Sequence, residues 1–273
     1  MVLAGTGVYG AAGAGVLLEL WRRKMEPYAV CGTGSGAWPA ALYAAGCDAE
    51  QFKTAAMQAQ HMGKRMLRKN SGRIAGCKAS FYTSLSMQRL LQAQTGGRIL
   101  ALCPRRTLFP LRSQRSGIVV LASPGGVWEE DVATVSQASA AFAARAAMGR
   151  PPFLEPLTWM GTSLLPMNST GEAVRLLLRA GAQRILVVEP RISPQAMPDP
   201  LWLTALAAEK GEENVIPGAI RLVIQMPPHI STMSFGSIVN CMELGRDAAK
   251  RELDGLLECL GMAHCRVLPF KRG

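Results

Sequence analysis

The sequence predicts an α/β fold with a mainly parallel central sheet that helices cover on both faces. Short apolar runs alternate with helix-like segments along the chain, and glycine or proline separates them, as in doubly wound proteins. The 273 residues are 49% apolar and 18% charged, which is typical of a globular protein with a large core. Neither a repeat nor a linker divides the chain, so we expect a single domain over residues 1–273.

In the N-terminal half, two short apolar strands each run into a glycine-rich turn and a helix. The strands are residues 2–5 and 28–32, and we expect them to be neighbours inside the sheet because both are apolar. Asp48 is the expected N-cap of a further helix. The expected helices cover residues 11–24, 35–46 and 47–62, and residues 63–97 are basic and helical in part.

In the C-terminal half, strands and helices continue to alternate. Ser169 and Glu172 have the spacing of a capping box at the start of an amphipathic helix. The expected strands are residues 98–103, 117–123, 184–190 and 219–228, with residues 104–116 as a loop rich in proline and arginine. The expected helices are residues 131–148, 169–182 and 245–259.

The chain is strongly basic, with a net charge of +11. Lysine and arginine concentrate between Lys64 and Lys78. We interpret this stretch as a solvated face, and peripheral contact with an anionic membrane is the alternative. No nucleic-acid partner is expected, because only 6% of the residues are aromatic and no known nucleic-acid motif occurs.

The seven cysteines contain no C-x-x-C pair, and with only three histidines no zinc-binding spacing can be assembled. We therefore expect reduced cysteines, no metal and a cytoplasmic protein. The first 18 residues carry no charge, but the basic residues follow this stretch, whereas in a signal peptide they precede the apolar region. We interpret the N-terminus as a buried strand and helix.

The first glycine-rich turn, GTGVYG at residues 5–10, fits the pattern G-x-G-x-x-G between a strand and a helix. In dinucleotide-binding proteins an acidic residue about 20 positions later holds the ribose. Here the candidate, Glu26, precedes the next strand instead of ending it. A nucleotide-binding oxidoreductase is therefore only an alternative, and no cofactor is expected.

The second turn, CGTGSGAW at residues 31–38, has the setting of a nucleophile elbow. That elbow needs Gly-x-Ser-x-Gly, and the middle position between Gly32 and Gly36 is Gly34. Ser35 lies one position later. We expect this step along the turn to direct its side chain away from the first turn and toward the helix start, where a hydroxyl caps exposed N–H groups.

The two turns, together with GTGSGAWPAALYAAGCDAEQF at residues 32–52, resemble the patatin-like phospholipase family. The resemblance extends through residues 138–161 and 173–190 and into residues 245–249, and it is least evident over residues 63–124. It implies hydrolysis of lipid acyl esters by a Ser–Asp dyad, with backbone N–H groups of the first turn holding the oxyanion.

Carried over position by position, the resemblance implies a site that has lost its chemistry. Gly34 occupies the nucleophile position and Met160 the aspartate position, so we expect an impaired enzyme, a pseudoenzyme of lipid metabolism. The degenerate elbow retains Gly32 and Gly36. An acyl or phospholipid ligand is expected beside the first turn, at Gly5, Thr6, Gly7 and Gly10.

An active serine lipid acyl hydrolase remains open as the alternative. It would use Ser35 as the nucleophile of a shifted elbow. Glu155, Glu172 or Asp131 would then have to supply the base, although none follows a recognisable turn motif. The three histidines are expected at the surface or in loops.

Overall fold

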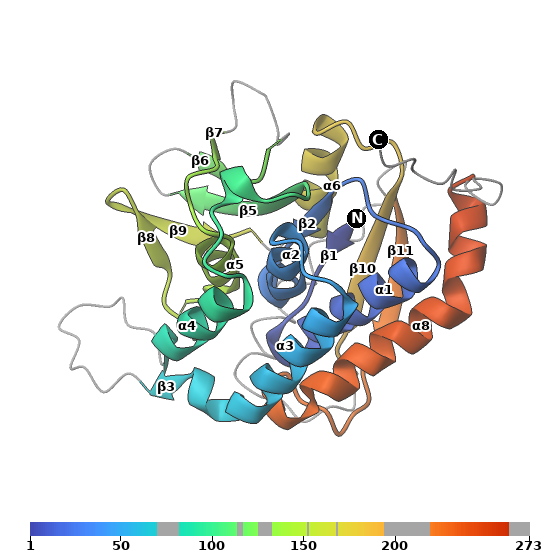
Figure 1. The fold of residues 1–273 in the computed structure, drawn as a ribbon, viewed down its shortest axis with the longest axis horizontal. Helices are drawn as coiled ribbons and strands as arrows, with labels where there is room; N and C mark the ends of the chain where they lie inside the picture. The colour runs from blue at the N-terminus through green and yellow to red at the C-terminus, as the bar shows by residue number, and fades with distance from the viewer. Residues whose placement is uncertain are drawn as a thin grey trace.

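A computed structural model of the chain shows one central sheet between helices (Figure 1). The structure describes residues 1–69, 82–113, 117–124, 133–151, 153–167, 169–193 and 219–261. Among them, the strands are β1 (Val2–Leu3), β2 (Val30–Gly32), β3 (Arg68–Lys69), β4 (Tyr82–Thr83), β5 (Thr107–Ser113), β6 (Gly117–Ala122), β7 (Ala133–Val135), β8 (Leu157–Trp159), β9 (Thr162–Pro166), β10 (Ile185–Arg191) and β11 (Ala219–Gln225).

The helices follow the strands in the order expected of an α/β protein. The α-helices are α1 (Ala11–Arg22), α2 (Ala37–Ala44), α3 (Ala49–Met62), α4 (Leu85–Gln94), α5 (Ala140–Met148), α6 (Thr170–Arg179) and α8 (Ile238–Cys259). The 3₁₀ helices are η1 (Gly7–Gly10), η2 (Gly34–Gly36), η3 (Gly63–Met66), η4 (Leu100–Leu102) and η5 (Phe235–Ser237). None of these described helices is both long and apolar enough to cross a membrane.

The main sheet has the order β11-β10-β1-β2-β5-β6-β7, with β8 and β9 attached to β5. The strands from β11 to β5 are parallel to their neighbours, and so are β6 and β7, whereas β5 pairs with β6 and β9 in antiparallel fashion. Val2 lies opposite Cys31 in the register of β1 and β2. The prediction of two neighbouring apolar strands inside a mainly parallel sheet is therefore confirmed.

Helices cover both faces of the sheet, but unequally. On one face, Leu3, Val30 and Phe109 belong to the larger core together with α1, α2, α3, α5 and α8. On the other face, Val2 and Cys31 pack with α6. Successive residues of β1 and β2 thus enter opposite cores, as the two-residue period of a strand requires.

The prediction of a strand at residues 98–103 is wrong, because this segment contains η4. The strand that joins the sheet in this part of the chain is β5 instead, which lies within the segment expected as a loop and contains Pro110. Proline cannot donate a ladder hydrogen bond. On one side, however, β5 pairs with β2 through Thr107 and Leu108, and then with β9 from Leu111 onward. Pro110 lies where the partner strand changes, so its missing N–H costs little.

Two helix boundaries also differ from the prediction. The segment expected as one helix over residues 131–148 contains β7, and α5 begins only after Ser139, whose hydroxyl accepts from the Phe142 N–H at 3.1 Å. The β-branched residues Thr134 and Val135 favour the strand. The last helix begins at Ile238 instead of residue 245. The N-cap roles predicted for Asp48 and Ser169 are confirmed.

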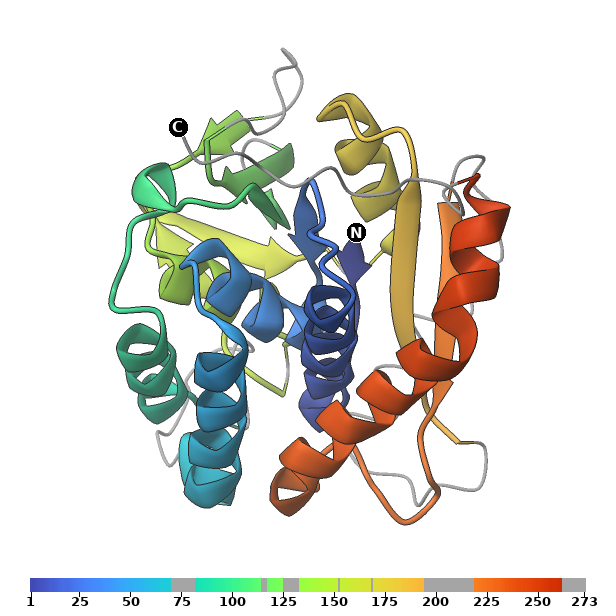
Figure 2. The same cartoon turned by 45° about the vertical axis from the view of Figure 1, so that its right-hand side comes forward.

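Helices α1 and α8 pack closely, as Figure 2 shows. A Cβ atom on Gly15 would lie 1.8 Å from the carbonyl oxygen of Met242, and one on Gly245 would lie 2.0 Å from that of Ala12. Only glycine permits this distance between the two backbones.

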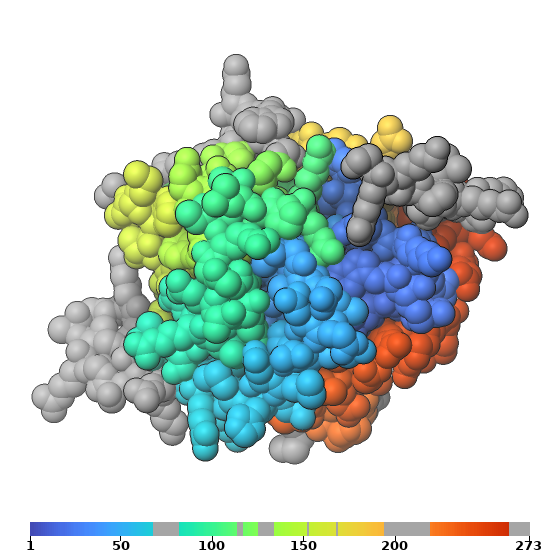
Figure 3. All heavy atoms as spheres, in the orientation of Figure 1, coloured from blue at the N-terminus to red at the C-terminus, as the bar shows by residue number. Residues whose placement is uncertain are grey.

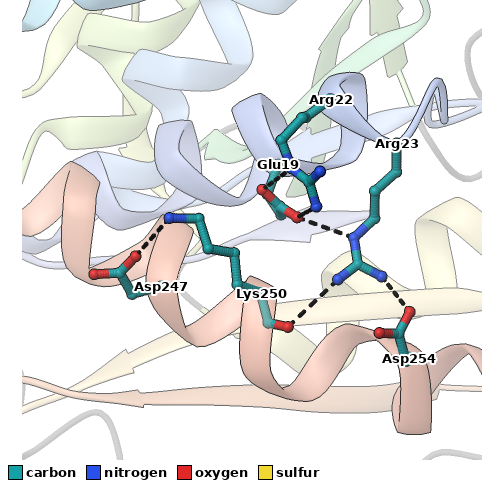
Figure 4. A network of polar contacts seen from close by, with 6 residues as sticks. All are labelled: Glu19, Arg22, Arg23, Asp247, Lys250 and Asp254. Atoms are coloured by element: carbon teal, nitrogen blue, oxygen red, sulfur yellow. Dashed lines mark hydrogen bonds and ion pairs between the residues drawn. The ribbon is translucent and has the colours of Figure 1, made fainter.

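A polar network ties the ends of the same two helices together (Figure 4). The buried carboxylate of Glu19 accepts hydrogen bonds from Arg22 and Arg23, and Arg23 also contacts Asp254 of α8. The hydrogen bonds from Arg22 are the main cause that lowers the pKa of Glu19 to about 2, although burial opposes the shift.

Candidate functional site

The first glycine-rich turn connects β1 to α1. Gly7 has a positive φ of 57°, and a Cβ atom there would lie 1.9 Å from the carbonyl oxygen of Thr232. That oxygen accepts the N–H of Val8 at 2.9 Å. The loop before η5 therefore holds this turn in place, and the turn requires glycine at residue 7.

The second turn connects β2 to α2 and keeps the backbone of an elbow. Gly34, at the position predicted for the nucleophile, has a positive φ of 53°. A Cβ atom on Gly36 would lie 2.1 Å from the carbonyl oxygen of Leu3, and one on Gly32 would lie 2.6 Å from the Cβ of Ala40. The three glycines thus permit a tight turn packed against β1 and α2.

Ser35 joins the two turns. Its N–H donates to the carbonyl oxygen of Gly5 at 2.9 Å, and its hydroxyl accepts from the N–H of Gly10 at 3.1 Å. The expected direction of this side chain, away from the first turn, is therefore wrong. The hydroxyl reaches the backbone because Gly10 has no side chain, and a Cβ atom there would lie 2.5 Å from Ser35 Oγ.

Two adjacent cavities, of about 80 Å³ and about 70 Å³, open beside the turns. They share five lining residues, listed here because they mark the junction: Gly7, Ser35, Met87, Met148 and Phe235. The larger cavity, which we call the polar branch, is lined by Gly5, Thr6, Gly34, Arg150 and Pro166 among others. The smaller one, the apolar branch, is lined by Trp38, Met66, Leu90, Leu91 and Ile238 among others.

The apolar branch lies under α3 and α4, which are side by side on the face seen in Figure 3. The side-chain amide of Gln94 also lines it, but this amide is already bonded within the protein. Its oxygen accepts from the Trp38 indole at 2.9 Å, and its nitrogen donates to the carbonyl oxygen of Ala55 at 2.9 Å. Apart from the residues shared with the polar branch, the described side chains of this wall are therefore apolar or already hydrogen-bonded.

The polar branch depends on a segment that follows α5, and Arg145 fixes this segment. The guanidinium of Arg145 is fully buried, contacts Ser84, and donates from Nη2 to the carbonyl oxygen of Glu155 at 2.8 Å. Desolvation lowers the pKa of Arg145 to about 10, although the Glu155 carboxylate opposes the shift. Sequence analysis missed both Arg145 and Arg150. Arg145 could have been noticed as the single charge within an alanine-rich helix.

The comparisons with known proteins give the family. A family model described as patatin-like phospholipase matches residues 1–165, which include both glycine-rich turns. The chain belongs to the patatin-like phospholipase family. No curated protein matches it in sequence.

Two solved structures match the chain over most of its length. The crystal structure of VipD from Legionella pneumophila matches with a TM-score of 0.51 and 11% identity, over 93% of this chain and 66% of the VipD chain. The type III effector protein ExoU gives a TM-score of 0.45 and 11% identity, over 93% of this chain and 52% of its own. The patatin-like chain thus spans less than two thirds of either neighbour.

The position that the family resemblance assigns to the catalytic aspartate lies outside the two cavities. Met160 is at the tip of the β8–β9 hairpin, with a positive φ of 47° and an exposed fraction of 88%. The residue of this hairpin that lines the polar branch is Pro166, at the other end of β9.

The acidic residues considered as alternative bases are engaged elsewhere. Glu155 accepts from the Ser84 N–H at 3.1 Å and pairs with Arg145 at 3.3 Å, and Glu172 contacts Arg175. Asp131 lies outside the described residues, as does His264. His61 and His229 are exposed. Among the described residues that line the cavities of this patatin-like protein, none is aspartate, glutamate or histidine.

Proposed function

We propose that this patatin-like protein binds a lipid acyl chain without hydrolysing it. The observation that carries the proposal is Gly34. Gly34 has a positive φ and lies in the elbow turn between β2 and α2. It has no side chain that could attack an ester. In a serine hydrolase the nucleophile, the base and the oxyanion donors act as a unit, so losing one member removes most of the rate.

The pocket supports the binding half of the proposal. The apolar branch starts at the first turn and continues between α2, α3, α4 and α8, so an acyl chain entering it would have its head beside Gly7 and Ser35. Methionine contributes Met66, Met87 and Met148 to the two branches. Its flexible side chain adapts to alkyl chains of different shape.

Hydrolysis and binding should be measured on the same preparation. We expect background turnover of p-nitrophenyl butyrate and of a dispersed phosphatidylcholine, together with saturable binding of an alkyl ligand such as methyl decanoate. A fluorophosphonate probe is expected to leave Ser35 unlabelled. Turnover above background, or a labelled serine, would contradict the proposal.

The second candidate is a hydrolase that uses Ser35, and it is favoured because Ser35 lines both branches. Its hydroxyl, however, accepts the Gly10 N–H, and no described lining residue supplies a base. Esterase activity that disappears in Ser35→Ala would establish this candidate instead.

Peripheral contact with an anionic membrane belongs to the same proposal. Lys64 and Arg65 are exposed on η3, and the next two residues, Met66 and Leu67, line the cavities. Cations beside a lipid-binding pocket would bring it toward a negatively charged surface. The rest of the basic stretch, from residue 70 onward, lies outside the described residues.

A further inference from the structure

The positive charge of the chain is confined to one stretch of the sequence. Residues 51–128 contain 13 of the 30 lysines and arginines and no aspartate or glutamate. The other 195 residues contain 17 basic and 19 acidic side chains, so they are close to neutral. A partner that is attracted by the net charge of this protein therefore meets the surface that residues 51–128 form.

The helical elements of this stretch lie on one side of the central sheet. Buried residues of α3, η3, α4 and η4 all belong to the larger core: Ala59, Met66, Leu91 and Leu100. Helices α3 and α4 are side by side in Figure 3, and Gln94 of α4 donates to the carbonyl oxygen of Ala55 in α3 at 2.9 Å. We call the outer surface of α3, η3 and residues 85–102 the basic face. Helix α6 packs on the opposite side of the sheet.

The cations of the basic face are accessible. Lys64 and Arg65 of η3 and Arg89 of α4 are exposed. Neither η3 nor α4 contains a carboxylate that could neutralise them. Glu50, at the start of α3, pairs with Lys53 of the same helix. The face thus presents an excess of positive charge to a negatively charged surface.

The basic face also exposes apolar side chains. It contributes four of the seven large apolar side chains that are exposed in the described part of the chain: Met57, Leu85, Ile99 and Leu102. Leu85 begins α4 and is 58% exposed, and Leu102 ends η4 and is 72% exposed. Water surrounds these side chains in the free protein, so removing them from water favours a partner that offers hydrocarbon.

Charge and hydrocarbon together favour a bilayer over a nucleic acid. A protein that binds single-stranded nucleic acid stacks the bases on aromatic side chains, whereas the four exposed apolar side chains of the basic face are leucine, isoleucine and methionine. Aliphatic side chains enter the acyl region of a bilayer, while lysine and arginine beside them remain at the anionic headgroups.

We propose that the basic face docks the protein on an anionic bilayer, with Leu85 and Leu102 entering the lipid. The inference rests on the proposed function and names the surface through which the lipid is reached. The inner sides of α3, η3 and α4 line the apolar branch. An acyl chain that passes between these elements would therefore reach the pocket from the bilayer without crossing water.

Sedimentation with vesicles of phosphatidylcholine and phosphatidylserine in equal parts tests the face. We expect Leu85→Ser and Leu102→Ser each to weaken binding about 3-fold or more, and Arg89→Gln to weaken it about 5-fold. The matched controls are Leu178→Ser and Arg175→Gln, because both residues are exposed on α6. Each control should change binding less than about 2-fold.

The orientation can be measured without removing a contact. Leu102→Trp places an indole on the basic face, and Leu178→Trp places one on α6. We expect brominated phosphatidylcholine in the vesicles to quench the added fluorescence of Leu102→Trp, measured against the unmodified protein, and to leave that of Leu178→Trp unchanged.

The outcomes separate this inference from the proposed function. If the variants of α6 weaken binding as much as those of the basic face, or if Leu178→Trp is the one quenched, the docking surface is wrong. Binding to an RNA oligonucleotide but not to vesicles would also overturn it. If no vesicle is bound while methyl decanoate binding saturates, the docking fails and the proposed function stands. If the basic face binds vesicles but no alkyl ligand is bound, the proposed function fails and the docking stands.

Discussion

The hydroxyl of Ser35 accepts a hydrogen bond from the backbone N–H of Gly10 at 3.1 Å, which ties the elbow to the first glycine-rich turn. A side chain that the sequence offers as a shifted nucleophile is therefore engaged in holding the two turns together.

Ser35→Ala is accordingly expected to affect stability and not chemistry. The substitution leaves the Gly10 N–H without its acceptor, and we expect a loss of about 1 kcal/mol in the free energy of unfolding. Urea unfolding measures it, with Ser237→Ala as the control because the hydroxyl of Ser237 makes no capping bond to α8. An unchanged midpoint for Ser35→Ala would mean that the Ser35–Gly10 bond does not stabilise the turns.

Two glycines of α8 should respond in opposite directions to alanine. At Gly245 the new Cβ atom would lie 2.0 Å from the backbone oxygen of Ala12, whereas at Gly255 nothing lies within 4 Å. We expect Gly245→Ala to destabilise the protein by about 2 kcal/mol or more because α1 and α8 must separate. Gly255→Ala should stabilise it by about 0.5–1 kcal/mol through helix propensity. Thermal unfolding of the two variants tests the α1–α8 contact directly.

The pH dependence of stability should reveal Glu19. Its hydrogen bonds from Arg22 and Arg23 lower its folded-state pKa to about 2 from an ordinary value of 4.5. A lowered pKa stabilises the fold above the ordinary value, and this contribution is lost as the pH falls from about 4.5 toward 2. We expect Glu19→Gln to cost about 2 kcal/mol at pH 7 and progressively less below pH 4.5.

The matched control for Glu19 is Glu243→Gln, on α8. Glu243 is part of a more exposed pair with Arg246 at 3.8 Å, so its loss should cost less than about 0.5 kcal/mol at any pH. If Glu19→Gln and Glu243→Gln behave alike in urea unfolding at pH 7 and pH 4, the buried network of Figure 4 does not stabilise the fold.

Membrane contact should depend on η3. We expect Lys64→Gln with Arg65→Gln to reduce sedimentation with vesicles that contain phosphatidylserine, because each cation near an anionic surface contributes about 1 kcal/mol. Added salt should weaken the binding of the unmodified protein, since exposed charges are screened. Equal sedimentation with phosphatidylcholine vesicles would rule out the basic surface as the cause.

Much of the fold follows from local sequence. Apolar residues of β1 and β2 and the glycines after them predict a parallel pair that runs into helices, and Asp48 and Ser169 mark helix starts. Pro110 misled the prediction, because proline argues against a strand unless the partner strand is known. That information belongs to β2 and β9, which are far from β5 in the sequence.

The site could be predicted only where it is contiguous in the sequence. The turns around Gly7 and Gly34 form local patterns, so their positions were predictable. Arg150 reaches the polar branch through α5 and the buried Arg145, and no local pattern predicts that relationship. The direction of the Ser35 side chain likewise depends on its hydrogen bond with Gly10, which is 25 positions away in the sequence.

Restoring a dyad tests the loss of chemistry most directly. Gly34→Ser places a hydroxyl at the elbow position, where φ is 53° and a side chain costs about 1–2 kcal/mol. The aspartate should then come from a residue that lines the polar branch. We expect Gly34→Ser with Pro166→Asp to give weak hydrolysis of p-nitrophenyl butyrate and fluorophosphonate labelling of residue 34. Gly34→Ser with Met160→Asp should stay at background, because residue 160 is 88% exposed at a hairpin tip. Activity in the Met160→Asp pair alone would show that this hairpin turns toward the elbow when substrate binds.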